Sequence, residues 1–209
     1  MKTAIQIILT VAILALGYLC VESIQKPVRF KQEHNERQEK VIERLEGIRE
    51  AQRAYKSLYG DFTGSFDTLI NFINTDSLRL VKMEGRLTDS MLEEGMTELK
   101  ALELGIIQRD TIFISAKDSL FSKNFVADSL RYVPFTQKEE FKMDATTIET
   151  ASGAEVPIFE AKVHNNTFLK GLDEQEIANI NDEARAYERY PGLKVGSLTE
   201  ANNSAGNWE

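Results

Sequence analysis

Residues 48–66 have the sequence IREAQRAYKSLYGDFTGSF, and this stretch decides how the chain is divided. Tyr55 and Tyr59 lie one helical turn apart, and Gly60 follows them directly. Glycine readily adopts the left-handed conformation that ends many helices, so we expect a helix to end here. We expect Phe62 and Phe66, the aromatic loop beyond the glycine, to fold back onto the tyrosines and fix the angle between helix and head. A ligand-stacking platform is the alternative.

The helix that ends at Gly60 carries a heptad seam. Its apolar and weakly polar positions are separated alternately by four and three residues: Val41, Leu45, Ile48, Gln52, Tyr55 and Tyr59. We predict that Val41, Leu45, Ile48, Tyr55 and Tyr59 form a packing or interaction face. This face packs either against its own domain or against a second copy in a coiled coil. Residues 31–40 are almost wholly polar and predict a solvated stalk or a helix held by ion pairs.

Before the stalk, residues 4–21 read AIQIILTVAILALGYLCV and contain no charged side chain. As a helix this run would be about 27 Å long, close to the thickness of a bilayer core. We therefore predict a transmembrane anchor whose lipid-facing residues include Ile5, Ile8, Leu9, Ile13, Leu16 and Leu19. A cleaved signal peptide and a lipoprotein modified at Cys20 are the alternatives.

Charge indicates where the domain beyond the anchor lies. Lys26, Arg29 and Lys31 would by simple count keep that flank inside, whereas a short N-terminal tail and a long acidic domain favour export. We expect a single-pass protein of the bacterial inner membrane with a periplasmic C-terminal domain. The net charge of −8 disfavours nucleic acid as a partner. The expected divisions are a cytoplasmic tail (1–3), an anchor (4–24), a stalk helix (25–60), a globular head (61–198) and a polar C-terminal tail (199–209).

The head has the mixed pattern of an α+β fold. Helices are predicted over 65–74, 88–105 and 172–190, with Ser65 or Asp67 capping the first and Asp173 the last. Period-two segments predict strands over 78–85, 110–121, 129–135, 141–150, 156–165 and 192–198. The segments on either side of residues 151–155 form the best hairpin candidate. We therefore expect an antiparallel sheet behind a long N-terminal helix.

An apolar N-terminus that continues into an amphipathic helix resembles the N-terminal half of type IV pilins and of type II secretion pseudopilins. The matching residues are Ala51, Tyr55, Gly60 and Phe62, with Leu69 on the following short helix. The resemblance implies a long helix, a loop and an antiparallel sheet in a subunit of an envelope complex. The leader cleavage site of those families and the glutamate near the start of their apolar run have no counterpart here, so the resemblance does not extend to that route of filament assembly.

A second pattern is a repeated Asp-Ser or Asp-Thr pair followed by an apolar residue. It resembles the general O-glycosylation motif of some Gram-negative periplasms. The resemblance implies candidate acceptors at Thr68, Ser77, Ser90, Thr111, Ser119 and Ser129. The alternative is that these pairs begin helices and turns by side-chain capping.

Residues suited to catalysis or metal binding are sparse. His34 lies in the polar stalk and His164 in a predicted turn, and neither has a partner at metal-ligand spacing. We expect no catalytic residue, metal or cofactor. The expected role is a structural or assembly subunit that contacts inner-membrane lipid and other envelope proteins, itself included. A tethered binding module for a peptide, lipid or glycan is the alternative, and a membrane-bound enzyme is a third.

Overall fold

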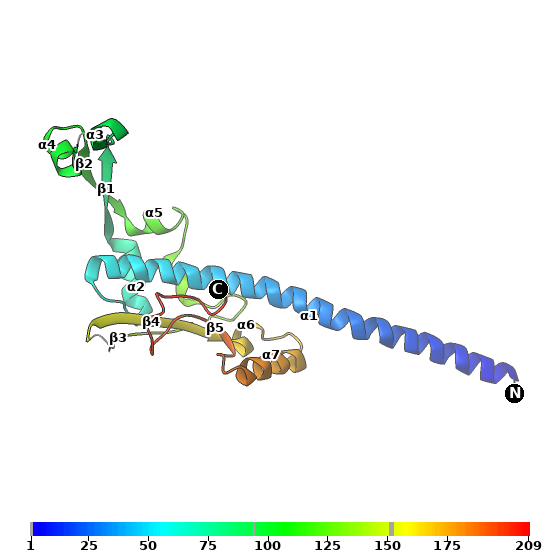
Figure 1. Cartoon of the computed structure of the whole chain (residues 1–209). Helices are drawn as coiled ribbons and strands as arrows, with labels where there is room; N and C mark the ends of the chain where they lie inside the picture. Colours follow the sequence, from blue (N-terminus) through cyan, green and yellow to red (C-terminus); the bar gives the residue numbers. More distant parts are fainter. Residues whose placement is uncertain (1, 94, 151–152) are drawn as a thin grey trace.

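The chain begins with one long helix, α1 (Lys2–Tyr59), which extends well beyond the rest of the molecule (Figure 1). The structure is a computed structural model that describes residues 2–93, 95–150 and 153–209. α1 continues through Pro27 without a break. The apolar segment and the predicted stalk therefore form one continuous helix. Gly60 follows with φ of 89°, the left-handed conformation expected of a residue that ends a helix. The fold is α+β, as the sequence predicts.

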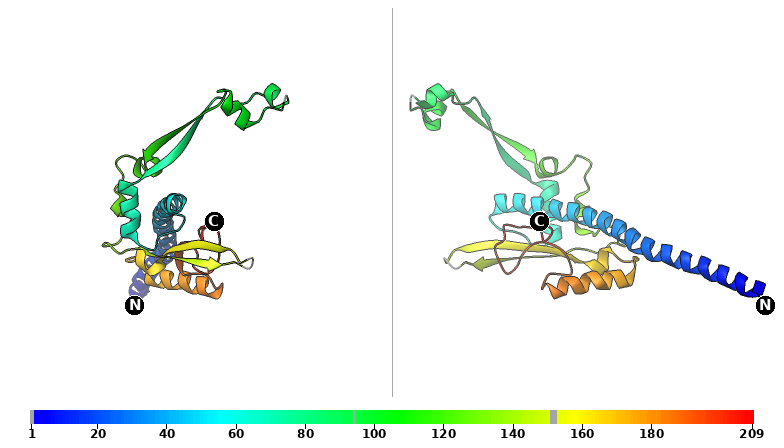
Figure 2. Two further views of the ribbon diagram at one scale, coloured as in Figure 1. Left: turned by 90° about the vertical axis from the view of Figure 1, so that its left-hand side faces the viewer. Right: turned by 45° about the vertical axis from the view of Figure 1, so that its right-hand side comes forward.

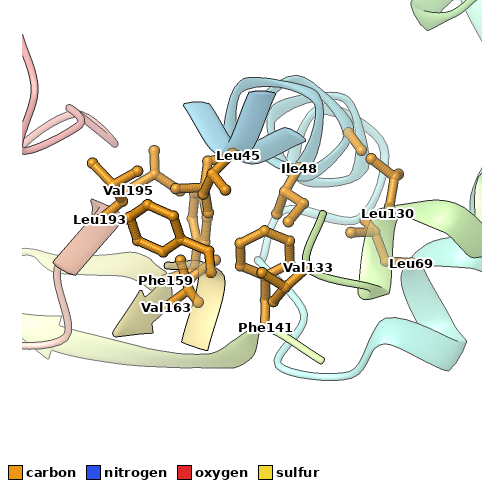
Figure 3. Packing of buried hydrophobic residues seen from close by; sticks show 14 of the residues in the cluster. Leu45, Ile48, Leu69, Leu130, Val133, Phe141, Phe159, Val163, Leu193 and Val195 are labelled. Carbon is orange, nitrogen blue, oxygen red and sulfur yellow. The ribbon is translucent and has the colours of Figure 1, made fainter. Parts of the chain in front are cut away.

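The C-terminal half of α1 packs against a three-stranded antiparallel sheet of order β3-β4-β5. The strands are β3 (Lys142–Glu149), β4 (Glu155–His164) and β5 (Gly192–Gly196). Leu45 faces Phe159 of β4 and Val195 of β5 across this core, whereas Ile48 lies over Val133 and Phe141 (Figure 3). β3 and β4 form the hairpin that the alternating sequence predicts, with Lys142 opposite Lys162 and Glu149 opposite Glu155.

Short helices complete the core on either side of α1 (Figures 1 and 2). They are α2 (Phe66–Thr75), α5 (Ala116–Leu120), the 3-10 helix η1 (Ala127–Arg131), α6 (Asn165–Phe168) and α7 (Glu174–Ala186). Ser65 caps α2 by accepting a hydrogen bond from the Thr68 amide, and Asp173 caps α7. Leu69 and Phe72 of α2 are buried against α1.

A second sheet projects from the head as an arm. It consists of β1 (Ser77–Glu84) and β2 (Gln108–Ser115), with α3 (Asp89–Glu93) and α4 (Glu98–Glu103) at its tip. The strands pair antiparallel along their whole length, from Ser77 opposite Ser115 to Glu84 opposite Gln108. Two views show the arm leaving the body of the molecule (Figure 2).

Four local expectations differ from the structure. The strand expected over residues 110–121 ends at Ser115, and residues 116–120 form the helix α5. Residues 88–105 form two short helices because the chain turns between them at Gly95, whose φ is 76°. Residues 129–135 contain the end of η1 instead of a strand, and only Tyr132 makes a bridge, to Glu140. The C-terminal segment is polar but folds back onto the head, where Gly206 pairs with Val195.

Candidate interaction surfaces

The first part of α1 is apolar on all sides and leaves its side chains uncovered. Seven large hydrophobic residues there are 58–69% exposed: Leu9, Val11, Ile13, Leu14, Leu16, Tyr18 and Leu19. The predicted anchor residues Ile5 and Ile8 have side chains outside the described part of the structure. Within that part, α1 is the one helix whose length and composition would allow it to cross a membrane. The exposed segment is consistent with a single-pass membrane protein.

The predicted heptad seam is covered by the head of the same chain. Val41, Leu45 and Ile48 are fully buried in the main core. Gln52, the one amide among the seam positions, is also fully buried, and its side chain donates to the Thr63 carbonyl and accepts from the Thr63 amide. Intradomain packing therefore uses the face that a coiled-coil dimer would need.

The tyrosines at the end of α1 meet a different ring from the one the sequence indicates. Tyr55 lies 4.6 Å from Tyr59 and 5.4 Å from Phe72, measured between ring centroids. Tyr59 donates a hydrogen bond to Asp76, which raises the pKa of the phenol. Phe62 packs instead against Phe159 at 4.8 Å, with the Lys56 ammonium over its other side. The expected cluster is thus divided between α2 and the sheet.

The structure also places Phe66 and most of the candidate glycosylation acceptors. Phe66 is half-buried against the core. Four acceptor hydroxyls lie on exposed residues: Thr68, Ser77, Thr111 and Ser119. Ser129 is half-buried and accepts a hydrogen bond from Arg44, and the side chain of Ser90 lies outside the described residues. The Asp67 carboxylate pairs with Arg131, whereas Ser65 performs the capping.

The projecting arm is a surface that sequence reasoning missed. Phe113 on β2 is 71% exposed, and Leu99 and Leu104 at the tip are 76% and 61% exposed. The sequence predicts both strands but does not indicate that they pair, because residues 85–107 separate them and contain no tight-turn signal. Only the tertiary fold shows that residues 108–113 of β2 are all exposed, so that both faces of this strand lie open to solvent.

A groove of about 550 Å³ lies between α1 and the segment around η1. Its apolar wall consists of Phe121, Phe125, Leu130, Pro134 and Phe135. Phe121 and Phe125 stack with centroids 4.1 Å apart, and Gly47 leaves room for Phe121 beside the helix. Phe135 is 51% exposed and adopts φ of 63°, which holds its ring at the rim.

Two arginines of α1 border this groove. The Arg44 guanidinium donates to the carbonyl and hydroxyl of Ser129, and burial lowers its pKa. The Arg37 guanidinium donates to the carbonyls of Phe168 and Lys170, each at 3.0 Å, and lies 5.4 Å from the Phe135 ring centroid. Within the described residues, neither guanidinium has a carboxylate at ion-pair distance.

Two smaller cavities lie near α7. One of about 390 Å³ is bordered by a chain of asparagines in which Asn165 donates to Asn181, and Asn181 donates to Asn166. The other, of about 240 Å³, is lined by aromatic rings that include Tyr187, Tyr190 and Trp208. The second cavity combines aromatic rings with polar groups, as many small-ligand sites do.

The two histidines have structural surroundings. His164 accepts a hydrogen bond from the Asn166 amide through Nδ1, and burial together with Arg185 and Lys142 lowers its pKa. His34 stacks on Phe30 with centroids 6.0 Å apart. Among the described residues, no group of three or more His, Cys, Asp or Glu side chains is placed to hold a metal ion.

Comparison with known proteins adds no functional residue to these surfaces. No protein-family model, curated protein or solved structure matches the chain.

Proposed function

We propose that this protein is a single-pass, membrane-anchored structural or assembly subunit of a bacterial envelope complex, acting through protein–protein contacts. The observation that carries this proposal is the double use of α1. Its first part exposes apolar side chains on all sides, and its last part forms the core of a folded head. Anchor and head are therefore joined by one helix without a hinge loop. A connection of this kind suits a structural subunit whose head keeps a fixed orientation relative to the membrane.

The pilin-like layout supports an assembly role. Ala51 is fully buried where α1 meets the sheet, and Gly60 ends the helix in the left-handed conformation. The long helix, the loop and the antiparallel sheet follow one another in the order that the resemblance implies. We extend the proposal to a secretion-related complex of the inner membrane, with the head in the periplasm and no catalytic activity.

The segment of α1 between the anchor and the buried seam sets the distance of the main core from the membrane. If the anchor ends near residue 24, the first fully buried seam residue, Val41, lies about 25 Å further along the helix. The intervening segment is mostly exposed, and Lys26 and Arg29 fall near the lipid headgroups. The head also reaches back along this segment, because Phe30 packs against the core, so part of the head lies close to the membrane surface.

A binding module remains the second candidate function. The observation that favours it is the aromatic cavity near α7, where Tyr187, Tyr190 and Trp208 lie with Asn207 and Arg189. Aromatic faces beside amide and guanidinium groups suit a peptide, lipid or glycan ligand. In this case the anchor would simply hold the site at the membrane surface.

Native mass spectrometry of the full chain, extracted from membranes in mild detergent, tests the proposal. We expect stoichiometric membrane proteins to accompany the chain and its mass to include the intact N-terminus. Additional mass on a peptide that contains an Asp-Ser or Asp-Thr motif would identify glycosylation. A lone monomer with a small molecule bound would favour the binding module, and a lone, ligand-free monomer would contradict both.

The anchor has a matched control on the same helix. Changing Leu14→Lys and Leu16→Lys should move the protein from the membrane to the soluble fraction, because each lysine costs a few kcal/mol at a bilayer centre. Leu58→Lys alters a leucine of α1 that is 43% exposed on the head, and it should leave the protein in the membrane. The natural protein, the variant with both Leu14→Lys and Leu16→Lys, and the Leu58→Lys control are compared by carbonate extraction of membranes. Equal extraction of these three proteins would contradict the anchor.

The side of the membrane is tested with thiol labelling. In a Cys20→Ser background, Ser119→Cys places one cysteine on an exposed residue of the head. A membrane-impermeant maleimide should label it in intact spheroplasts at the same rate as in lysed ones. Labelling only after lysis would place the head in the cytoplasm.

A further inference from the structure

The groove beside α1 is the largest of the three cavities described above, and most of its lining is hydrocarbon. Its volume is about 550 Å³, within the range that holds small organic ligands. Leu130, which is 1% exposed, lies on its inner side, and Phe135 stands exposed at its rim. Three charged side chains of α1 border the groove, and the rest of its lining has no side chain that forms hydrogen bonds: Gly47, Phe121, Phe125, Leu130, Pro134 and Phe135.

The charged side chains of the lining are Lys40, Glu43 and Arg44. Lys40 and Glu43 form an ion pair 2.9 Å apart, and the hydrogen bond from Lys40 lowers the pKa of the Glu43 carboxyl. Arg44 donates only to neutral acceptors, the carbonyl and the hydroxyl of Ser129. Two cations and one anion leave the lining with a net charge of +1, although the whole chain has a net charge of −8.

Charged groups on the neighbouring segments do not change the sign within the groove. The Arg37 guanidinium lies 5.4 Å from the ring centroid of Phe135, which places a further cation at the rim. On η1, Asp128 is paired with Arg131 at 3.6 Å. The acidic residues on the preceding turn of α1, Glu36 and Glu39, lie near Lys40 but outside the lining. The lining, where water is scarcest and charges interact most strongly, is therefore cationic.

Arg44 keeps donors that nothing in the described part of the chain uses. A guanidinium has donors on three nitrogens, and both hydrogen bonds of Arg44 are made through Nη1 alone. Burial lowers the pKa of Arg44, which shows that the charge is partly withdrawn from water. A half-buried guanidinium of this kind is stabilised when a carboxylate reaches it, because charge-assisted hydrogen bonds are stronger than neutral ones.

The hydrocarbon part of the lining selects the body of the ligand. A peptide would bury its amides in the groove without partners, and an unpaired buried amide is costly. A hydrocarbon chain has no such groups. Arg44 lies about 30 Å along the helix beyond residue 24, so a phospholipid that remains in the bilayer does not reach it. The occupant that fits is a free molecule with an apolar body and one carboxylate.

We propose that the groove beside α1 binds a free carboxylic acid with a hydrocarbon chain, of the class of medium-chain fatty acids. Its carboxylate pairs with Arg44, and its chain lies against Phe125, Leu130 and Phe135. This site is separate from the aromatic cavity near α7. The proposal goes beyond the assembly role and does not depend on it.

Calorimetric titration of the full chain in lipid nanodiscs, with protein-free nanodiscs as the blank, tests the site. The probes are octanoate and octan-1-ol, which has the same chain length without the carboxylate. We expect one octanoate to bind per chain, about tenfold more tightly than octanol. N-acetyl-trileucine with a free carboxylate should bind more weakly than octanoate, because its amides would lose water without gaining partners.

Two pairs of variants separate the carboxylate contact from the chain contact. Arg44→Gln should weaken octanoate about tenfold and leave octanol unchanged, whereas Arg53→Gln alters an arginine of α1 outside the lining and should change neither. Phe135→Asn should weaken both probes about threefold, and asparagine tolerates the positive φ of this residue. Val126→Asn, at an exposed residue outside the lining, should weaken neither. The thermal midpoint of Trp208 fluorescence shows that each variant is folded.

The outcomes separate this site from the proposed function. Equal affinity for octanoate and octanol in the natural protein would overturn the role of Arg44 and the proposal with it. Tighter binding of N-acetyl-trileucine would make the occupant a peptide carboxyl terminus and overturn the fatty-acid class. If no probe binds beyond the blank while the chain still co-purifies with stoichiometric envelope proteins, the site is wrong and the assembly role stands. If Arg44→Gln unfolds the head, an unchanged affinity of Phe135→Asn for both probes would still overturn the site.

Discussion

At the scale of single residues, Gln52 decides how the end of α1 is joined to the head. Its amide is fully buried and satisfies both the amide and the carbonyl of Thr63. Its nitrogen also lies 3.2 Å from the Met143 sulfur on β3. One side chain thus connects the helix, the loop after Gly60 and the sheet. A buried polar residue of this kind specifies position more than it adds stability.

Gln52→Leu should lower the free energy of unfolding by about 1–3 kcal/mol, because both polar groups of Thr63 lose their partner inside the protein. Urea unfolding followed through Trp208, the one tryptophan of the sequence, measures this change in the head. Gln38→Leu makes the same substitution on α1 at a partly exposed residue, and it should change stability by less than about 0.5 kcal/mol. Equal effects at the two positions would contradict this role.

His164 should make the head less stable in mild acid. Its pKa is lowered by burial and by Arg185 and Lys142, so the folded protein binds the proton more weakly than the unfolded chain, whose pKa is near 6.5. The stability from the neutral ring is therefore complete above pH 6.5 and is lost as the pH falls through the folded pKa. Protonation also removes the Nδ1 acceptor of the Asn166 amide.

The measurement compares thermal midpoints at pH 7.5 and pH 5.0 in the natural protein and in His164→Asn. Asparagine keeps a cap acceptor and does not titrate in this range. The thermal midpoint should fall further between pH 7.5 and pH 5.0 in the natural protein than in the variant. Carboxylates elsewhere contribute equally to both proteins, so an identical pH dependence would show that His164 does not contribute.

At the scale of elements, the arm behaves as an addition to the head. The tip has its own small core, in which Ala101 and Ile107 are buried but do not join the main hydrophobic cluster. Among the arm residues whose side chains the structure describes, only Leu78 at the base packs against that cluster. The arm and the head should therefore lose structure independently, because little apolar surface is shared between them.

Gly85→Ala should disorder the tip and leave the head intact. A methyl group at Gly85 would lie 2.1 Å from the Ile106 carbonyl oxygen, and the residue has φ of 89°. Gly95→Ala is the matched control, because Gly95 also has positive φ but has nothing within 4 Å. Trypsin should cleave the first variant after Arg86 and Lys100 about tenfold faster than the control, with the same midpoint for Trp208 fluorescence. A lower midpoint would show that the arm and head are coupled.

At the scale of the whole molecule, α1 is divided by what covers it. Upstream of Phe30 the large apolar side chains that the structure describes are exposed, whereas Phe30 packs against the core and Arg37 donates to carbonyls at and just after the end of α6. The C-terminal segment closes the other side, where the Glu209 carboxylate pairs with Arg49 of α1. The head thus begins inside the helix, with no linker between anchor and domain.

A chain that begins at Val28 should be soluble and keep the thermal midpoint of the full protein. A chain that begins at Lys40 loses Phe30 and Arg37, which should cost roughly 3 kcal/mol in stability. At about 2–4 °C per kcal/mol, its midpoint should fall by roughly 6–12 °C. Tryptophan fluorescence and size-exclusion chromatography measure both properties. Aggregation of the longer chain would show that the head needs the anchor.

Local patterns were sufficient for much of the fold. The alternation on either side of residues 151–155 predicted the β3–β4 hairpin, and the capping residues Ser65 and Asp173 marked the starts of α2 and α7. These features depend on neighbours in the sequence. The sequence predicted one helix at the tip because it does not show that the chain turns at Gly95. It predicted a strand where η1 ends because the apolar residues of that segment have a spacing close to that of a strand.

By itself, the sequence determined an uncharged apolar segment, a long helix that ends at Gly60, and an α+β head, because these follow from composition and short-range periodicity. Only the tertiary structure decided that the seam from Val41 to Ile48 is covered by its own head, that β1 pairs with β2 in a projecting arm, and that Arg44 borders an apolar groove. These facts depend on contacts between distant residues. Burial and pairing are set by which surfaces meet, and that is not contained in any local pattern.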